Sequence, residues 1–159
     1  MVAFGTDWTV QLRGAGPIRL GMTLPEVRRV IGDPKANIEG NEPAVPLNEC
    51  AYLRSNRLPS GLGIMFENWR VVRIDVWKKG IRTVSGAAVE DTEGRVKLLH
   101  PGRITVEAHH YHPDGHYLNY SSTERADQSY GMVFETDGAK VTSIRTGTLK
   151  AIALVEGCS

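Results

Sequence analysis

A pattern of two apolar arms around a short turn occurs twice in this 159-residue sequence and constrains the fold more than any other feature. The sequence GIMFE at 63–67 matches GMVFE at 131–135 in the kind of residue at every position. Each is followed by a polar turn and a second apolar arm, at 71–76 and 141–144 respectively. Apolar arms on either side of a turn are typical of β-hairpins. Because a repeat of this length indicates a duplicated architecture, we expect two copies of one structural unit.

Each half of the chain also contains a pattern that predicts a short helix before its hairpin. Thr23 and Glu26 have the spacing of a capping box, in which each side chain accepts a hydrogen bond from the backbone of the other residue. In the second half, Asp91 or Thr92 can cap a short helix. The proline- and glycine-containing segment 35–48 predicts little regular structure beyond one edge strand near its start.

These elements predict an α+β fold, a tandem repeat of a short helix plus antiparallel β-hairpins that form one curved sheet with the helices on one face. The length fits a single domain over 1–159. We expect its two structural repeats at approximately 17–78 and 82–147, followed by a C-terminal strand at 149–156.

Parity within the strands assigns side chains to two faces, because successive side chains point in opposite directions. The face beneath the expected helices is apolar and comprises Leu53, Ile64, Phe66, Val72, Ile74, Val76, Leu118, Met132, Phe134 and Ile144. The other face is aromatic and charged and comprises Tyr52, Arg73, Asp75, Trp77, His109, Tyr111 and Tyr117. No predicted helix covers this second face, so we expect it to bind a protein partner, the alternative being that its rings merely cover the sheet. Trp69, in a hairpin turn, joins the candidate contact residues.

The histidines suggest an alternative function, because four of the five lie within 109–116. A three-residue turn at 113–115 would make His112 and His116 cross-strand neighbours, with His110 on the same face. Three converging imidazoles would suit zinc or copper. The competing interpretation is a solvated hairpin end with no cofactor, and we prefer it because the spacing is not specific.

Charge and motif content narrow the function classes. Nineteen basic and 18 acidic residues give a net charge of +1, which does not favour nucleic acid as a partner. No apolar segment approaches the ~20 residues needed to span a bilayer. Ser60 lies outside any Gly-x-Ser-x-Gly elbow, and a dinucleotide fingerprint does not occur. We therefore expect a protein that is not an enzyme, and a small hydrolase is the third alternative, with no motif in its support.

The two cysteines bear on the compartment. Cys158 is the penultimate residue, where it has little packing to offer, so a disulfide with Cys50 that pins the chain end is a natural use for it. Two unpaired thiols in the cytosol are the alternative. The disulfide would indicate a periplasmic or secreted protein.

The order of these features resembles a known superfamily. The sequence GPIRLGMT at 16–23 leads into the first helix, and a cysteine, the hairpins, a second copy and the sequence EGC at 156–158 follow. This layout is similar to the β-lactamase-inhibitor-protein-like (BLIP-like) superfamily and to the SmpA/OmlA-type outer-membrane lipoproteins. The resemblance implies one curved sheet of tandem repeats and makes the disulfide more plausible. It also implies a non-enzymatic envelope or secreted module that binds another protein with its concave face, as an inhibitor of a hydrolase would. The signal sequence, and a lipid anchor in one alternative, would then precede residue 1.

Overall fold

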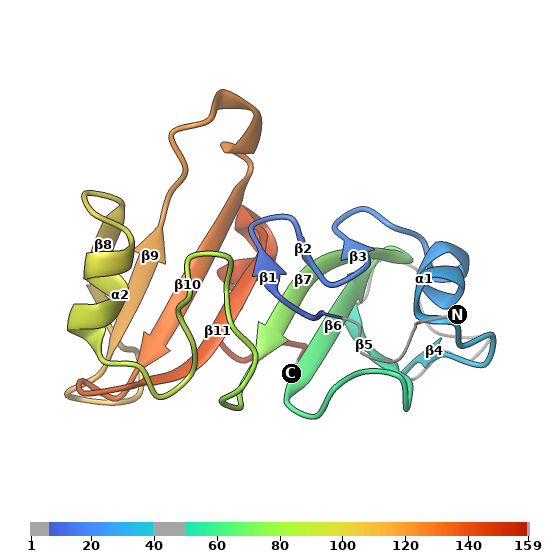
Figure 1. The fold of residues 1–159 in the computed structure, drawn as a ribbon, viewed down its shortest axis with the longest axis horizontal. Helices are drawn as coiled ribbons and strands as arrows, with labels where there is room; N and C mark the ends of the chain where they lie inside the picture. Colours follow the sequence, from blue (N-terminus) through green and yellow to red (C-terminus); the bar gives the residue numbers. More distant parts are fainter. Residues whose placement is uncertain (1–6, 40–49, 159) are drawn as a thin grey trace.

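The computed structural model describes residues 7–39 and 50–158, which form a mixed α+β architecture built mainly from antiparallel strands (Figure 1). Within these residues, one eight-stranded sheet has the order β4-β5-β6-β7-β11-β10-β9-β8, and a small sheet has the order β1-β2-β3. The strands are β1 Val10–Gln11, β2 Gly14–Ala15, β3 Ile18–Arg19, β4 Asn37–Ile38, β5 Cys50–Arg54, β6 Leu62–Glu67, β7 Arg70–Val76, β8 Ile104–Ala108, β9 His116–Tyr120, β10 Tyr130–Thr136 and β11 Val141–Thr148. The helices are α1 Leu24–Ile31, α2 Glu93–Leu99, the 3-10 helix η1 Arg125–Asp127 and α3 Leu149–Ile152.

Both predicted hairpins are confirmed, because β6 pairs with β7 and β10 pairs with β11, each antiparallel. Asn68 and Trp69 close the first hairpin with φ angles of 54° and 63°. Two left-handed residues in succession are typical of the tight turns that match the twist of a hairpin. The hairpins join side by side, with Ile144 opposite Val76. The order of one helix and four strands thus occurs twice along the chain, and its origin by duplication stays a prediction.

One assignment from parity is wrong. The pairing of β6 with β7 shifts by one residue between Met65 and Phe66, so that Phe66 lies opposite Val71. This β-bulge turns Val71 into the core, where it is 1% exposed, and leaves Val72 only partly buried. The remaining nine residues assigned to the apolar face all belong to the main core cluster.

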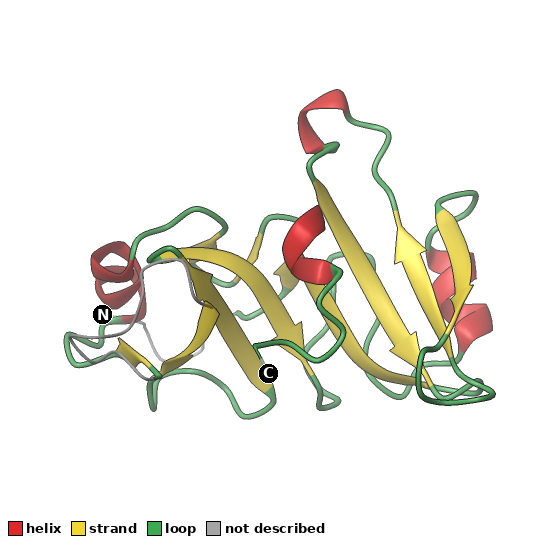
Figure 2. Ribbon diagram, turned by 180° about the vertical axis from the view of Figure 1, so that it is seen from behind, coloured by secondary structure: helices red, strands yellow, loops and turns green. Residues whose placement is uncertain are grey.

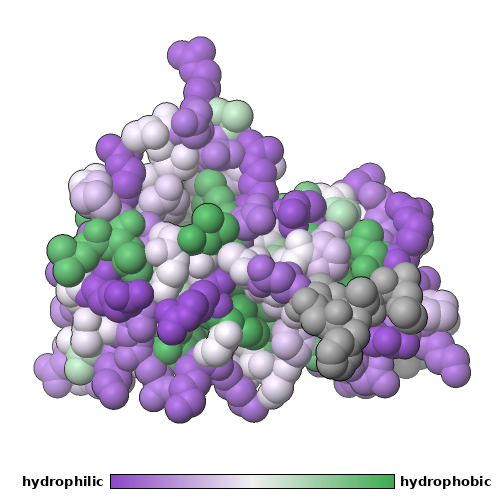
Figure 3. Space-filling view, in the orientation of Figure 1, coloured by the Kyte–Doolittle hydropathy of each residue, from purple (hydrophilic) through white to green (hydrophobic). Residues whose placement is uncertain are grey.

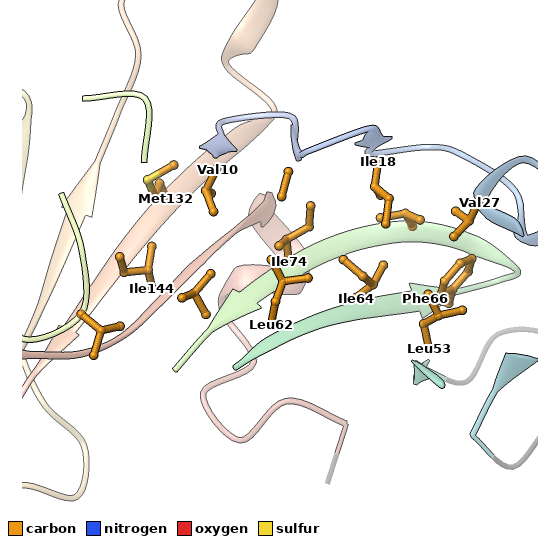
Figure 4. Packing of buried hydrophobic residues seen from close by; sticks show 14 of the residues in the cluster. Val10, Ile18, Val27, Leu53, Leu62, Ile64, Phe66, Ile74, Met132 and Ile144 are labelled. Carbon is orange, nitrogen blue, oxygen red and sulfur yellow. The ribbon is translucent and has the colours of Figure 1, made fainter. Parts of the chain in front are cut away.

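The core lies between the large sheet and a layer formed by α1, α2 and the small sheet (Figure 1). Figure 4 shows Ile18 and Val27 from that layer facing Ile64, Phe66 and Ile74 on the strands. Helix α1 begins at the predicted capping box, and Thr92 caps α2 by accepting a hydrogen bond from the Arg95 N–H. The edge strand expected at the start of segment 35–48 is β4, and residues 40–48 lie outside the described residues.

The predicted C-terminal strand at 149–156 is wrong. Residues 149–152 form α3, whose N-cap Thr148 accepts a hydrogen bond from the Ala151 N–H. β11 already has β7 and β10 as neighbours, so the chain leaves the sheet and crosses its face. We call residues 149–158 the strap, and Figure 2 shows it on the side of the sheet opposite α1 and α2. The expectation that helices occupy only one face of the sheet is therefore also wrong.

Candidate functional site

Two buried arginines fix the strap to the sheet. Arg73, which is 3% exposed, donates from Nη1 to the carbonyl oxygens of Ala151 and Leu154 at 2.9 and 2.6 Å. Arg145, which is 4% exposed, donates from Nε to the carbonyl oxygen of Ile152 at 2.7 Å. The carbonyl oxygens of Ala151 and Leu154 also accept the backbone N–H groups of Leu154 and Gly157, so Arg73 joins acceptors that the turns of the strap already use to the sheet.

Each arginine has a carboxylate beside it. Arg73 forms an ion pair with Asp75 at 2.7 Å, and Arg145 forms one with Glu135 at 2.9 Å. The Tyr52 hydroxyl donates to Asp75 at 3.0 Å. Burial raises the pKa of the Tyr52 phenol, and the Asp75 carboxylate raises it further, so Tyr52 remains a protonated donor at neutral pH. The charges beneath the strap are thus compensated by hydrogen-bonded partners, as buried charges must be.

Tyr117 forms the other part of the floor beneath the strap. It is 2% exposed and clusters with Val133 and Ile152. Its ring stacks on His109 with a centroid separation of 4.7 Å, and the Arg145 guanidinium lies 5.4 Å from its centroid. Tyr117 therefore holds α3 in place instead of facing solvent.

The expectation that this face is uncovered is thus wrong at its centre. The strap buries Arg73 and Tyr117 and leaves Tyr52 and Asp75 only partly exposed. Strand parity assigned these side chains to the correct face, but it contains no information about a distant segment that folds over them. Arg145 was not identified from the sequence. The same parity rule predicts its position, because Arg145 follows the core residue Ile144 in β11 and must therefore point to the other face of the sheet.

The far end of the strap is joined to β5. A disulfide links Cys158 to Cys50, with their Cα atoms 5.6 Å apart, which confirms the predicted pair. Gly157 precedes it with a φ of +68° and lies so close to Tyr52 that an added Cβ would be 2.9 Å from the Tyr52 Oη. A residue with a side chain would be strained there, so glycine lets the strap reach the first half of the sheet.

Exposed aromatic rings flank the strap. Trp77 is 51% exposed and Tyr111 is 67% exposed. A Cβ on Gly63 would lie 3.0 Å from the Trp77 ring and 3.3 Å from the Tyr52 ring, so both rings lie over Gly63. On the other side, the Tyr111 hydroxyl donates to the Glu156 carboxylate at 2.7 Å, and this bond raises the pKa of Tyr111. We call the continuous surface formed by Trp77, Tyr52, Gly157, Glu156 and Tyr111 the aromatic strip.

Trp69 does not belong to the aromatic strip. It is partly buried and packs against the main core, next to a pocket that Pro25 of α1 also lines. Its ring Nε1 is buried, with no hydrogen-bond partner in the described part of the chain. The structure therefore places Trp69 on the side of the sheet that carries α1, where packing explains it.

The histidines do not adopt the predicted hairpin. β8 ends at Ala108, which lies opposite His116, so His112 is not the cross-strand neighbour of His116. The segment 109–115 forms a loop instead, in which the N–H groups of Tyr111 and His112 donate to His109 Nδ1. His110 meets the edge of the Tyr117 ring, and His116 turns to Glu93. Among residues 7–39 and 50–158, no group of three or more His, Cys, Asp or Glu side chains is arranged to hold a metal ion. Zinc or copper binding by His110, His112 and His116 stays an untested hypothesis without support from this geometry.

Glu93 links α2 to the sheet. Its carboxylate accepts hydrogen bonds from the Thr136 hydroxyl and, at 2.8 Å, from His116 Nδ1. Burial acts to raise the pKa of this carboxyl, but the bonds from Thr136 and then His116 outweigh it and lower the pKa below the usual 4.5. The ionised form is therefore the one that the folded state prefers.

We expect Glu93→Gln to lower the free energy of unfolding at pH 7 by about 1.5–3 kcal/mol, the usual range for hydrogen bonds to a charged group. A depressed folded-state pKa gives stability that is present above the unfolded pKa and lost as the pH falls through the folded value. The difference between the wild type and Glu93→Gln should therefore shrink below about pH 4.5. Urea denaturation of the wild type and of Glu93→Gln at pH 7 and at pH 3.5 measures this difference in the free energy of unfolding. Glu90→Gln, at an exposed carboxylate 3.9 Å from Lys79, is the control, and an equal pH dependence in both variants would contradict the assignment.

Comparisons with known proteins bear on the fold. No protein-family model matches the chain, and no curated protein matches it. Two solved structures are similar. The uncharacterized protein yfeY from Escherichia coli has 12% identity and a TM-score of 0.48, with 87% of this chain and 99% of that chain covered. An extracellular protein containing a SCP domain from Bacillus anthracis str. Ames has 10% identity and a TM-score of 0.51.

The second similarity covers 84% of this chain and 45% of the Bacillus anthracis chain, so this chain spans less than half of that protein's length. At 10% identity, it concerns the fold alone. Neither structure tests the resemblance to the BLIP-like superfamily, which stays a proposal.

Proposed function

We propose that this protein binds another protein through the aromatic strip, without chemistry at that surface. The observation that carries the proposal is that Trp77 and Tyr111, at 51% and 67% exposure, flank one strap on one face of the sheet. Tryptophan and tyrosine are enriched at the energetic centres of protein interfaces. An exposed large ring gains the most from a partner that removes it from water.

The support beneath the aromatic strip favours binding. The strap is held by Arg73, Arg145 and the disulfide, so the surface beside it is ordered before a partner arrives. Order that exists in the free protein lowers the entropic cost of association. A partner that presents an extended segment along the strap, with apolar groups toward Trp77 and Tyr111, suits this shape.

The disulfide also supports a location outside the cytosol. Disulfides persist mainly in oxidising compartments, and within the described ranges no helix is long and apolar enough to cross a membrane. Both observations are compatible with a periplasmic or extracellular protein. A duplicated BLIP-like architecture, inhibition of a hydrolase and a lipid anchor before residue 1 are further proposals, made on the resemblance of the sequence layout.

The test compares Trp77→Ala with Leu98→Ala. Leu98 is 82% exposed on α2, across the sheet from the aromatic strip, so its removal controls for the loss of any exposed apolar side chain. The wild type is immobilised and exposed to an extracellular or periplasmic extract, and the protein that it specifically retains is purified. The affinity of this purified partner is then measured for the wild type and for each of the two variants. We expect Trp77→Ala to weaken that affinity by about 30-fold or more, as hot-spot residues do, and Leu98→Ala to leave it unchanged. Equal affinity of all three forms would rule out the aromatic strip as the site.

A further inference from the structure

A hydrogen-bonded serine and histidine lie on the face opposite the aromatic strip. Ser85 Oγ is 2.7 Å from His100 Nε2, and His100 Nδ1 is 2.7 Å from the carbonyl oxygen of Val96. A carbonyl oxygen only accepts hydrogen bonds, so Nδ1 must carry the ring proton. Nε2 of the neutral ring is then the acceptor of the Ser85 hydroxyl proton. This is the arrangement of a nucleophile, a base and a group that orients the base.

The surroundings hold both side chains in this geometry. His100 is 8% exposed at the end of α2, with the rings of Tyr120 and Phe134 centred 5.2 and 5.4 Å away. Thr83 Oγ1 lies 2.8 Å from Ser85 Oγ and accepts the Ala87 N–H. Because the Ser85 proton goes to His100, the Thr83 hydroxyl donates to Ser85 Oγ. The chain of bonds from Thr83 to Val96 therefore fixes the direction of proton transfer.

The turn at Ser85 also presents a backbone N–H group next to the Ser85 hydroxyl. Gly86 has a φ of +97°, and its N–H donates to the Thr83 carbonyl oxygen, which closes a tight turn around Ser85. Among the described residues, the Ser85 N–H has no acceptor. A free N–H next to a nucleophilic hydroxyl is a donor of the kind that stabilises an oxyanion.

A pocket of about 500 Å³ opens beside the pair and gives it access to a ligand. Ser85 and His100 line it together with apolar side chains, among them Val10, Leu12, Val84 and Met132. Of the described residues that line it, none is Asp, Glu, Lys or Arg. The space-filling view of this side shows a mostly hydrophilic surface in which hydrophobic residues gather in smaller patches (Figure 3). A small neutral molecule with an apolar group fits these walls.

We propose that Ser85 and His100 form an acyl-transfer site for small neutral esters with an apolar acyl group. Ser85 Oγ forms a bond to the ester carbonyl carbon while His100 Nε2 takes the hydroxyl proton. The carbon–oxygen bond to the alcohol breaks, and the departing alcohol takes that proton from His100. A water molecule then attacks the acyl-serine, gives its proton to His100 and releases the carboxylic acid, after which the proton returns to Ser85. The site shares no residue with the aromatic strip, so the experiment below tests it independently of the proposed binding function.

The test treats the full chain with an alkyl fluorophosphonate. Ser85 Oγ displaces fluoride from phosphorus, and its proton leaves through His100, which gives a stable phosphonyl-serine. Mass spectrometry of the digested protein should place the label on Ser85. The wild type should also hydrolyse p-nitrophenyl butyrate. If deacylation is slower than acylation, the reaction starts with a burst of nitrophenolate that approaches one equivalent per protein molecule. If deacylation is faster, nitrophenolate is released at a steady rate from the start.

Two variants and one control make the result specific. Ser85→Ala should abolish labelling, and His100→Gln should slow it by about 100-fold or more, the usual contribution of a positioned base. Ser60→Ala is the control, because Ser60 accepts a hydrogen bond from Lys78, which is not a base of this kind. Unlabelled wild-type protein, label on another residue, or equal labelling of Ser85→Ala would overturn the proposal. If His100→Gln shows no cooperative melting transition, the variant is not folded and its labelling rate is not used. The labelled peptide of the wild type and the Ser85→Ala variant then test the proposal.

Discussion

Replacing Arg73 with methionine is expected to lower the free energy of unfolding by about 3–5 kcal/mol, the usual cost of breaking a buried ion pair on one side. The variant would leave the Asp75 carboxylate uncompensated under the strap. It would also remove the donor that the carbonyl oxygens of Ala151 and Leu154 share. Urea denaturation at pH 7, followed by tryptophan fluorescence, measures the change.

A matched arginine separates this effect from the loss of charge alone. Arg54 lies on β5, with its side chain 72% exposed and 3.8 Å from Glu39, so Arg54→Met should change stability by no more than ~0.5 kcal/mol. The double variant Arg73→Met/Asp75→Asn should recover part of the loss, because it removes the unpaired charge. A stability of Arg73→Met equal to that of Arg54→Met would show that Arg73 does not hold the strap.

Cys158→Ser is expected to cost about 4 kcal/mol of unfolding free energy and to lower the melting temperature by roughly 10 °C. The disulfide joins residues 108 positions apart, and long closed loops restrict the unfolded chain most. Thermal unfolding of the oxidised wild type and of the variant, followed by circular dichroism, measures the difference.

The partner cysteine supplies the control. Cys50→Ser should destabilise the protein as much as Cys158→Ser does, and the double variant should be no less stable than either. A reducing agent should lower the melting temperature of the wild type to the same level and leave the variants unchanged. If the single variants melt with the oxidised wild type, the bond contributes nothing to stability.

The sequence predicted what local chemistry determines. The capping box at Thr23 and Glu26 and the two hairpins follow from short-range rules about hydrogen bonds and turns, and the structure contains them. The disulfide could be predicted for another reason, since a cysteine at the end of a chain has few other roles. The bulge at Val72 could not, because it depends on how one strand slips against its neighbour.

The candidate sites were harder to predict, because they depend on contacts between distant segments. The strap covers Arg73 and Tyr117 because Ile152 packs against Tyr117 and Val133 and because Arg73, Arg145 and the disulfide bind the strap to the sheet. Ser85 and His100 belong to a loop and a helix end that carry no recognisable motif. The loop at 109–115 replaces the expected hairpin because its backbone bonds to His109 instead of to a strand.

The bond between Cys50 and Cys158 has a consequence for how this molecule can be degraded. It converts the chain from β5 to the end of the strap into a closed covalent ring that contains seven strands of the eight-stranded sheet in the described structure. A protease that cuts once within this ring, for example in the loop at 121–129, opens it but releases no fragment. Two cuts within the ring, or one cut followed by reduction, are needed before any piece of the ring can leave. A protein closed in this way can be nicked and still remain one molecule with its fold held together.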